Sequence, residues 1–197
     1  MIHTGQEMKD AATAVPAKRR QRAGIVSRFI GNRDGATAIE FGMLIIPFLL
    51  LVFAILETTI SFAAQQIMSN AGDTIARQVR TGQLRAADLD EKTLKQLVCD
   101  DLKIIVADNC PGLEVDLREY STFDDASKQR IEFTSDDDID TTDFDVDPGK
   151  SLSINMLRLF YRWPVMTDLM RSSMSNMKDN NTLLYSTITW QNEPFND

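Results

Sequence analysis

Residues 41–56 read FGMLIIPFLLLVFAIL, sixteen residues without a charge, and this stretch decides the fold. The apolar character continues after Glu57 through residues 58–64. Sixteen helical residues reach about 24 Å, which is short of a hydrocarbon core of ~30 Å, so the flanks 36–39 and 58–60 must contribute. A buried core helix is the alternative. Because the stretch has almost no polar face, we expect a single membrane span instead.

The charge of the chain is divided on either side of this stretch. The 197 residues hold 21 Lys and Arg against 29 Asp and Glu, a net charge of -8. Residues 1–35 hold seven basic and three acidic residues, a net of +4, which leaves -12 for residues 36–197. Basic flanks stay cytoplasmic, so we expect the N-terminus inside and the acidic region outside. The acidic total argues against a general affinity for nucleic acid.

The residue types also limit the chemistry. The single histidine is His3, which excludes histidine-based triads and His-rich zinc sites. Paired carboxylates are numerous, but acidic surfaces usually serve solvation. We therefore expect no enzyme active site and no cofactor.

A short motif precedes the apolar stretch. Gly35 is followed five residues later by Glu40, which lies at the start of the apolar helix with Phe41 after it. An acidic side chain at the middle of a membrane helix costs about 2.5–3.5 kcal/mol, and less near the interface, so this carboxylate needs a partner. Its alternative role is that of a carboxylate that reaches back to the cytoplasmic interface.

The motif and its basic leader resemble the prepilin cleavage site of type IV pilins, and more closely that of the Tad/Flp tight-adherence system. The resemblance implies that a membrane prepilin peptidase removes a basic leader, residues 1–35, by cutting between Gly35 and Ala36. It further implies that Glu40 and Phe41 serve assembly, with Glu40 pairing with the free N-terminus of a neighbouring subunit.

Both ends of the chain carry this resemblance. The apolar segment contains Pro47 and has Glu57 near its outer end, and residues 187–195 read TITWQNEPF. These features resemble the TadE-like group of pseudopilins. The middle of the chain, residues 83–150, matches no named pattern.

The resemblance implies a non-enzymatic minor pseudopilin, needed for assembly of an adhesive Tad/Flp pilus. Its implied partners are the prepilin peptidase, other pilins and pseudopilins, the inner-membrane assembly platform and the lipid bilayer. Its implied location is the bacterial inner membrane, with one span and a periplasmic C-terminal domain. The alternative is an extracytoplasmic enzyme or ligand-binding protein anchored by an uncleaved signal. An ordinary secretory signal, cut near Ala63 and Ala64, also explains the order of charges.

The helical period continues beyond the span. Apolar residues recur at i, i+3 and i+4 spacing at positions 64, 67, 68, 71, 75 and 79. One helix over 36–81 is predicted, ending at Gly82. Its residues 36–64 form the span and residues 65–82 an extracytoplasmic continuation with one apolar side, which should pack on the domain formed by residues 83–197.

This outer domain is predicted to be α+β with a small antiparallel sheet, as in a pilin-like head. A helix is predicted over 88–107, with Asp88 or Asp90 as its cap. Alternating apolar residues predict strands, and helical spacing of Val165, Leu169 and Met174 predicts a short helix over 165–177. The strands are expected in residues 113–120, 130–134, 151–163 and 183–191.

Two cysteines, Cys99 and Cys110, are the only ones in the chain. In an exported domain this spacing favours one short-loop disulfide; two unpaired buried thiols and an intermolecular link are the alternatives.

The densest charged feature is the acidic segment, residues 136–147, with seven aspartates in twelve residues. The offsets of Asp136, Asp138, Asp140 and Asp147 resemble a calcium loop. The segment departs from that pattern, because Thr141 stands where the loop needs Gly and Asp147 where it needs a bidentate Glu. We expect a solvated acidic loop or an electrostatic docking surface, with calcium as the weaker candidate and no other metal.

Overall fold

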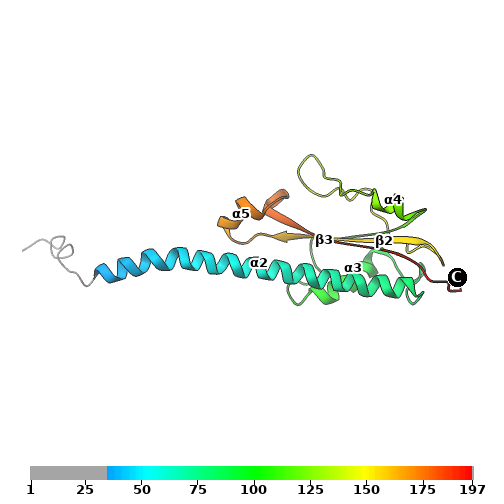
Figure 1. Cartoon of the computed structure of the whole chain (residues 1–197), viewed down its shortest axis with the longest axis horizontal. Coiled ribbons are helices and arrows are strands. Elements are labelled where there is room, and N and C mark those ends of the chain that lie inside the picture. Colours follow the sequence, from blue (N-terminus) through cyan, green and yellow to red (C-terminus); the bar gives the residue numbers. More distant parts are fainter. Residues whose placement is uncertain (1–34, 197) are drawn as a thin grey trace, which may run out of the picture. The chain divides into compact units, whose positions relative to one another are not determined.

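The computed structural model describes residues 35–196. The chain divides into two units, Met1–Ile45 and Ile46–Asp197. The described part of the first unit is Gly35 and the first turns of a long helix, and the second unit holds the rest (Figure 1). Residues 1–34 of the predicted leader lie outside the described residues.

Helix α2 spans Ala36–Arg80, 45 residues, and confirms the predicted long helix. Pro47 lies inside it. The helix stops because Gly82 takes a φ of 71°, a left-handed conformation that glycine adopts without steric cost. An added Cβ at Gly82 would also lie 2.7 Å from the ring of Phe195, so a side chain has no room there.

The predicted antiparallel sheet is present and has three strands in the order β1-β2-β3. The strands span Leu113–Tyr120, Ile154–Pro164 and Asn181–Gln191. Strand β2 is central: Leu157 pairs with Leu117 of β1 and with Ile188 of β3. Most of β2 is buried without alternation, since both faces of the sheet are covered.

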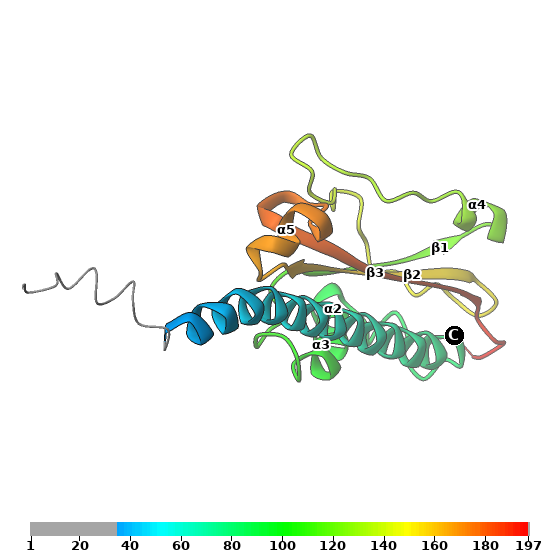
Figure 2. The ribbon, with the colours of Figure 1, turned by 60° about the vertical axis from the view of Figure 1, so that its left-hand side comes forward.

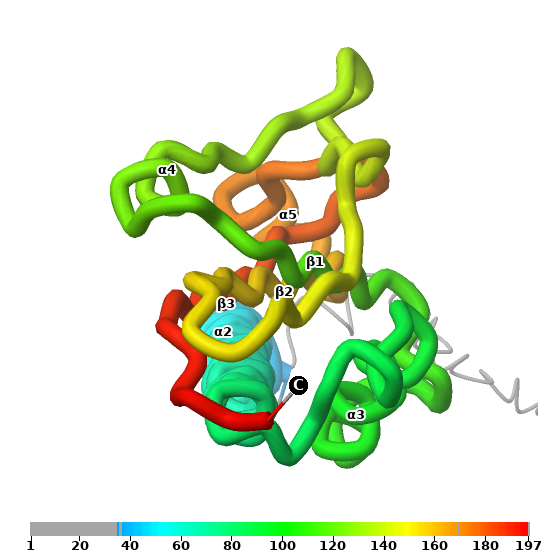
Figure 3. The backbone as a smooth tube through the Cα atoms, turned by 90° about the vertical axis from the view of Figure 1, so that its right-hand side faces the viewer, coloured from blue at the N-terminus to red at the C-terminus, as the bar shows by residue number. Residues whose placement is uncertain are grey.

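The second unit has three layers, which are clearest when α2 is viewed end-on (Figure 3). Helices α2 and α3 (Glu91–Leu102) cover one face of the sheet. The other face carries α4 (Phe123–Ser127), the segment that leads to β2, and α5 (Asp168–Met174) (Figure 2). The sheet therefore lies in the middle of the unit.

Two apolar cores follow from this layering. The main core joins the sheet to α2 and α3, and a smaller one on the opposite face holds Ile139, Phe160 and Met177. Close approach of α2 to the sheet depends on Gly72, where a Cβ would lie 2.6 Å from Cδ1 of Ile188. From α2 the main core takes Ala64, Met68, Ala71, Ile75, Ala76 and Val79.

The second predicted helix is shorter than expected. Helix α3 spans Glu91–Leu102 rather than 88–107, with Asp90 as its N-cap, accepting from the Thr93 amide at 2.7 Å. Three consecutive β-branched residues, 104–106, follow its end, and such residues disfavour helix. The chain turns instead, and Asn109 adopts a φ of 66°.

Two smaller expectations need correction, and one short helix was not expected. The strand predicted over 130–134 is absent, leaving one bridge between Phe133 and Ile139, because Thr134 turns the chain by donating from its amide to the Asp138 carbonyl at 2.7 Å. Leu152 is not in a strand: it has a φ of 65° and ends a turn. Helix α4 was not expected, although Thr122 caps it with a hydroxyl that accepts from the Asp125 amide.

The predicted disulfide is confirmed. Cys99 in α3 and Cys110 in the following turn are bonded, with their Cα atoms 5.7 Å apart. The bridge fastens the end of α3 to the turn that leads into β1.

Replacing both Cys99 and Cys110 by Ser should lower the free energy of unfolding by about 2–4 kcal/mol, because the open chain gains loop entropy in the unfolded state. Chemical denaturation of both proteins measures this difference. Mass spectrometry of the alkylated, unreduced wild type is the check on the bond itself, and two alkylated thiols would contradict it.

Candidate assembly surface

The first half of α2 presents an uncovered apolar surface. Among the described residues α2 is the one helix long and apolar enough to cross a membrane, and none of its most apolar window is buried. Apolar surface of this extent indicates contact with lipid or with other apolar helices. The exposed large side chains over this half, each 42–73% exposed, are Ile39, Phe41, Met43, Leu44, Ile46, Phe48, Leu49, Leu50, Leu51, Phe53, Ile55 and Leu56.

The predicted processing and assembly residues lie at the start of α2. Gly35 immediately precedes the helix, and a Cβ added to it meets nothing within 4 Å. Glu40 is exposed, and no ion pair involving it is found within residues 35–196. Phe41 is 64% exposed. The scissile bond after Gly35 and the role of Glu40 stay predictions.

Glu57 behaves differently from Glu40. It follows the uncharged stretch directly, yet only 8% of it is exposed. Its Oε1 accepts from the Met166 amide at 2.5 Å, and its Oε2 accepts from the Thr167 amide at 3.2 Å and from the Thr167 hydroxyl. This carboxylate therefore joins α2 to the connection between β2 and α5.

The C-terminal motif fastens the other end of α2. Asn192 is 2% exposed, accepts from the Trp190 indole at 2.8 Å and donates to the Lys150 carbonyl at 2.9 Å. Next to it, the Glu193 amide donates to the Arg80 carbonyl at 2.9 Å, and their side chains pair at 3.4 Å. The motif thus has a structural role at the end of the helix.

A buried ion pair joins β1 and β2 on the face opposite α2. Asp116 is fully buried, and its Oδ2 lies 2.7 Å from Nη2 of Arg158, which is 5% exposed. Asp116 also accepts from the Asp145 amide at 3.1 Å and pairs with Arg118 at 3.0 Å. The ion pair thereby holds the acidic segment against the sheet.

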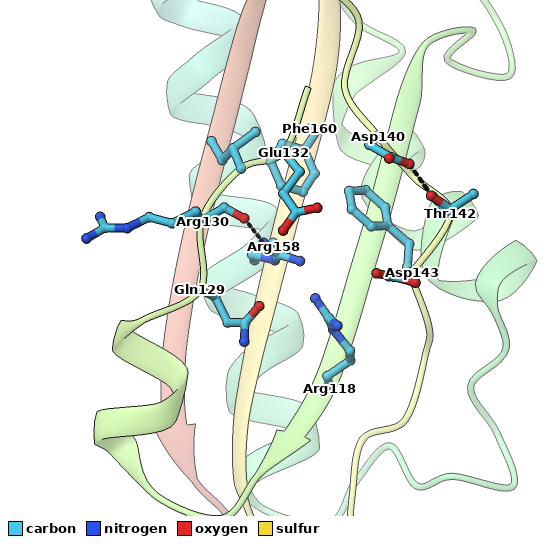
Figure 4. A pocket seen from close by; sticks show the side chains of 11 residues that line it. Arg118, Gln129, Arg130, Glu132, Asp140, Thr142, Asp143, Arg158 and Phe160 are labelled. Atoms are coloured by element: carbon cyan, nitrogen blue, oxygen red, sulfur yellow. Dashed lines mark hydrogen bonds between the residues drawn. The ribbon is translucent and has the colours of Figure 1, made fainter. Parts of the chain in front are cut away.

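A pocket lies beside this ion pair (Figure 4). Its volume is about 50 Å³, and it is lined by acidic and basic side chains from the sheet and from residues 129–144. Ligand pockets of about 300–1,000 Å³ are typical for small molecules, so this one suits water rather than a substrate. A more open hollow of about 830 Å³ runs along α3, where Lys95 is held by Glu91 at 2.8 Å and Glu114 at 2.7 Å.

The aspartates of the acidic segment do not converge on one point. Asp138 pairs with Arg162 at 2.8 Å and Asp136 with Lys178 at 3.6 Å. Asp140 accepts from the Thr142 amide at 3.0 Å, and Asp147 accepts from the Gly149 amide at 2.9 Å. No group of three or more potential metal ligands occurs among residues 35–196. The calcium candidate gains no support from this arrangement.

The ion pair with Arg162 also affects the pKa of Asp138. Burial by itself would raise the pKa of this carboxyl, but hydrogen bonds from Arg162 and from the Ile139 amide outweigh it and hold the pKa below its usual 3.8. The pKa of Asp140 is lowered too, by its hydrogen bonds to Thr142. Both lowered pKa values reflect hydrogen bonds that favour the charged carboxylate.

The fold and the uncovered helix define an α+β protein in which residues 35–196 hold one candidate membrane helix, near the N-terminus. The family model described as TadE-like protein matches residues 35–77, so this segment is similar to TadE-like proteins, in agreement with the resemblance seen in the sequence. No curated protein and no solved structure gives a significant match.

Sequence reasoning missed the two main polar contacts of the second unit. The alternation of β1 placed Asp116 on the face opposite Leu113, Val115 and Leu117, and nothing in the pattern indicated that this face is covered. Glu57 stood out as a charge at the end of an apolar helix, but its partner Thr167 lies 110 residues further along the chain.

Asp116→Ala should lower the free energy of unfolding by about 3–5 kcal/mol, because it leaves the Arg158 guanidinium buried without its counter-charge. Thermal or urea unfolding measures the loss. The exposed Asp143→Ala is the matched control and should change stability by less than about 0.5 kcal/mol. Equal effects of the two substitutions would contradict the importance of the buried pair.

Proposed function

We propose that this protein is a minor pseudopilin that takes part in assembling a Tad/Flp-type adhesive pilus. The observation that carries the proposal is the TadE-like match over residues 35–77, which begins at Gly35 and includes the uncovered half of α2. A subunit of this kind needs an apolar helix that can pass from lipid to contact with other apolar helices. The first half of α2 has that surface.

The proposed pathway begins at the cytoplasmic face of the inner membrane. A prepilin peptidase cuts after Gly35 and releases the basic leader, so the mature chain starts at Ala36. The head formed by residues 83–197 lies in the periplasm. The uncovered half of α2 then contacts other pilins and pseudopilins and the inner-membrane assembly platform.

The TadE-like match supports a structural role in assembly rather than catalysis. The hollow along α3 has charged walls, and two of its three lysines, Lys95 and Lys103, are already paired with carboxylates. The alternative function, an enzyme or binding protein anchored by an uncleaved signal, predicts a chain that still begins at Met1. N-terminal sequencing of the membrane-extracted protein separates the two: Ala36 supports the pseudopilin, and Met1 the anchored protein.

Gly35→Leu should block processing, because a bulky side chain at the scissile bond intrudes on the peptidase cleft. The substitution is a clean test, since a Cβ at this position meets nothing within 4 Å and the fold has no reason to resist it. Immunoblotting in cells with the cognate peptidase should show a chain heavier by the 35 residues of the leader.

Gly42→Leu is the matched control for that test. Gly42 also lies in open space, inside α2, and its substitution should leave cleavage unchanged. Normal processing of the Gly35→Leu chain would contradict the assigned cleavage site.

Glu40→Gln should leave insertion and expression unchanged but abolish crosslinking to pilus partners and surface adherence. The physical reason is the proposed pairing of this carboxylate with the new N-terminus of a neighbouring subunit. Losing one member of such a pair costs up to about 3–5 kcal/mol where both groups are buried.

Glu40→Asp keeps the charge and is the control, expected to retain part of the adherence. Normal pili in a Glu40→Ala strain would overturn the assembly role and leave a carboxylate that simply reaches the cytoplasmic interface.

A further inference from the structure

The contact between Glu57 and the connection after β2 fixes a part of the head at a defined level along α2. The carboxylate of Glu57 binds the backbone of Met166 and Thr167, as described above. One residue further along α2, the Thr58 hydroxyl lies 3.9 Å from Sδ of Met174 at the end of α5. Both ends of α5 are therefore held beside the same turn of α2.

That level coincides with the end of the apolar stretch. Side chains of a helix tilt toward its N-terminus, so the Glu57 carboxylate lies beside the last turn of residues 41–56. A spanning helix needs about 20 apolar residues, and counted from Ala36, the start of α2, these end at Ile55. If this helix spans the bilayer, the outer lipid boundary therefore lies close to Glu57 rather than at residue 64. Met166, bonded to that carboxylate, then lies at the boundary and not in bulk water.

The segment 165–177 has the composition of an interfacial contact. Met166 is 72% exposed, although its neighbour Val165 is buried. Polar groups accompany the methionines: Asp168 and Arg171 form an ion pair one helical turn apart. On α2 the exposed apolar surface also continues past Glu57, to Ile60 at 46% and Phe62 at 70%. Exposed apolar side chains beside charged pairs suit the border between headgroups and acyl chains.

We infer that the segment 165–177 rests on the outer surface of the lipid bilayer, with Met166 in the headgroup–acyl border and Glu57 fixing the height of the head above the membrane. This inference rests on the membrane span of the proposed function. Lipid is the occupant because the segment is continuous with the apolar helix at the level where that helix leaves the membrane. The head is thereby held at the membrane by the segment 165–177 as well as by α2.

The test uses the full chain in phosphatidylcholine vesicles. Both native cysteines are in the disulfide, so a cysteine introduced by Met166→Cys is a unique thiol for a spin label. Power-saturation EPR compares its collisions with oxygen, which enters lipid, and with a water-soluble nickel chelate. We expect the nickel accessibility of this label to be several-fold lower than that of a label at Phe123→Cys. Its oxygen accessibility should lie between those of labels at Phe123→Cys and Leu51→Cys.

The two reference positions make the outcomes distinguishable. Phe123, 51% exposed, starts α4, which lies at the opposite end of β2 from α5, and should report water (Figure 1). Leu51, 60% exposed in the apolar stretch, should report lipid when substituted by Cys. If Leu51→Cys does not report lipid, the span and the proposed function fail. If it does, but Met166→Cys is as accessible to nickel as Phe123→Cys, only the present inference is overturned.

Varying the amount of protein per lipid tests a second copy as the occupant. Contact with lipid should not depend on this ratio. Protection of the Met166 label only at high protein density, with spin–spin broadening, would overturn the inference in favour of a contact between copies.

A second variant tests the part played by Glu57. In the Met166→Cys background, Glu57→Ala should make the label more mobile and spread its depth, because the connection after β2 loses its anchor. Thr59→Ala is the matched control: its hydroxyl bonds only within α2, to the Ile55 carbonyl at 2.7 Å, and its loss should leave the label unchanged. An unchanged depth of the label in the Glu57→Ala variant would show that Glu57 does not fix the height of the head above the membrane.

Discussion

Packing of the second half of α2 against the sheet is the interaction on which the second unit depends. The helix contributes a stripe of small and medium side chains, and at Gly72 it offers no side chain at all, so Ile188 and Leu159 contact its backbone. Such close packing gains dispersion energy and removes apolar surface from water. Because α2 approaches so closely, the sheet and α3 can share one core with it.

Apolar packing alone does not fix how far α2 is shifted along its axis relative to the sheet. Polar contacts fix this register. Glu57 holds the connection after β2 near the start of the buried half, and Arg80 meets Glu193 at its end. Between them, the Gln65 side chain donates to the Tyr185 carbonyl of β3 at 2.6 Å. A slip of α2 by one turn would break all three contacts. The buried half of α2 is thus fixed in position, while the uncovered half stays available for lipid or for other helices.

On the opposite face of the sheet, ion pairs hold the covering segment in place. There the cover includes a long, strongly acidic segment that adds only a few apolar side chains, such as Ile139 and Phe144, to the smaller core. It is held by arginines: Arg158 binds Asp116 and lies over the Phe144 and Phe160 rings, and Arg162 binds Asp138. The cost of burying Asp116 is offset by several hydrogen bonds to one carboxylate. The acidic segment is thereby part of the fold, and its remaining exposed carboxylates keep that face strongly negative.

The sequence by itself determined the elements that depend on local pattern. The uncharged stretch before Glu57 and the i, i+3, i+4 spacing after it predicted α2, and Gly82 marked its end. Alternation predicted β1 and β3. The Gly35 and Glu40 motif indicated a prepilin cleavage site, and the apolar segment together with residues 187–195 indicated the TadE-like resemblance. Only the tertiary structure decided what covers the second face of the sheet, why Asp116 is buried, and which residues Glu57 binds. The reason is physical: period and capping act over a few residues, whereas a buried carboxylate is stabilised by partners that the fold brings from 42 or 110 positions away.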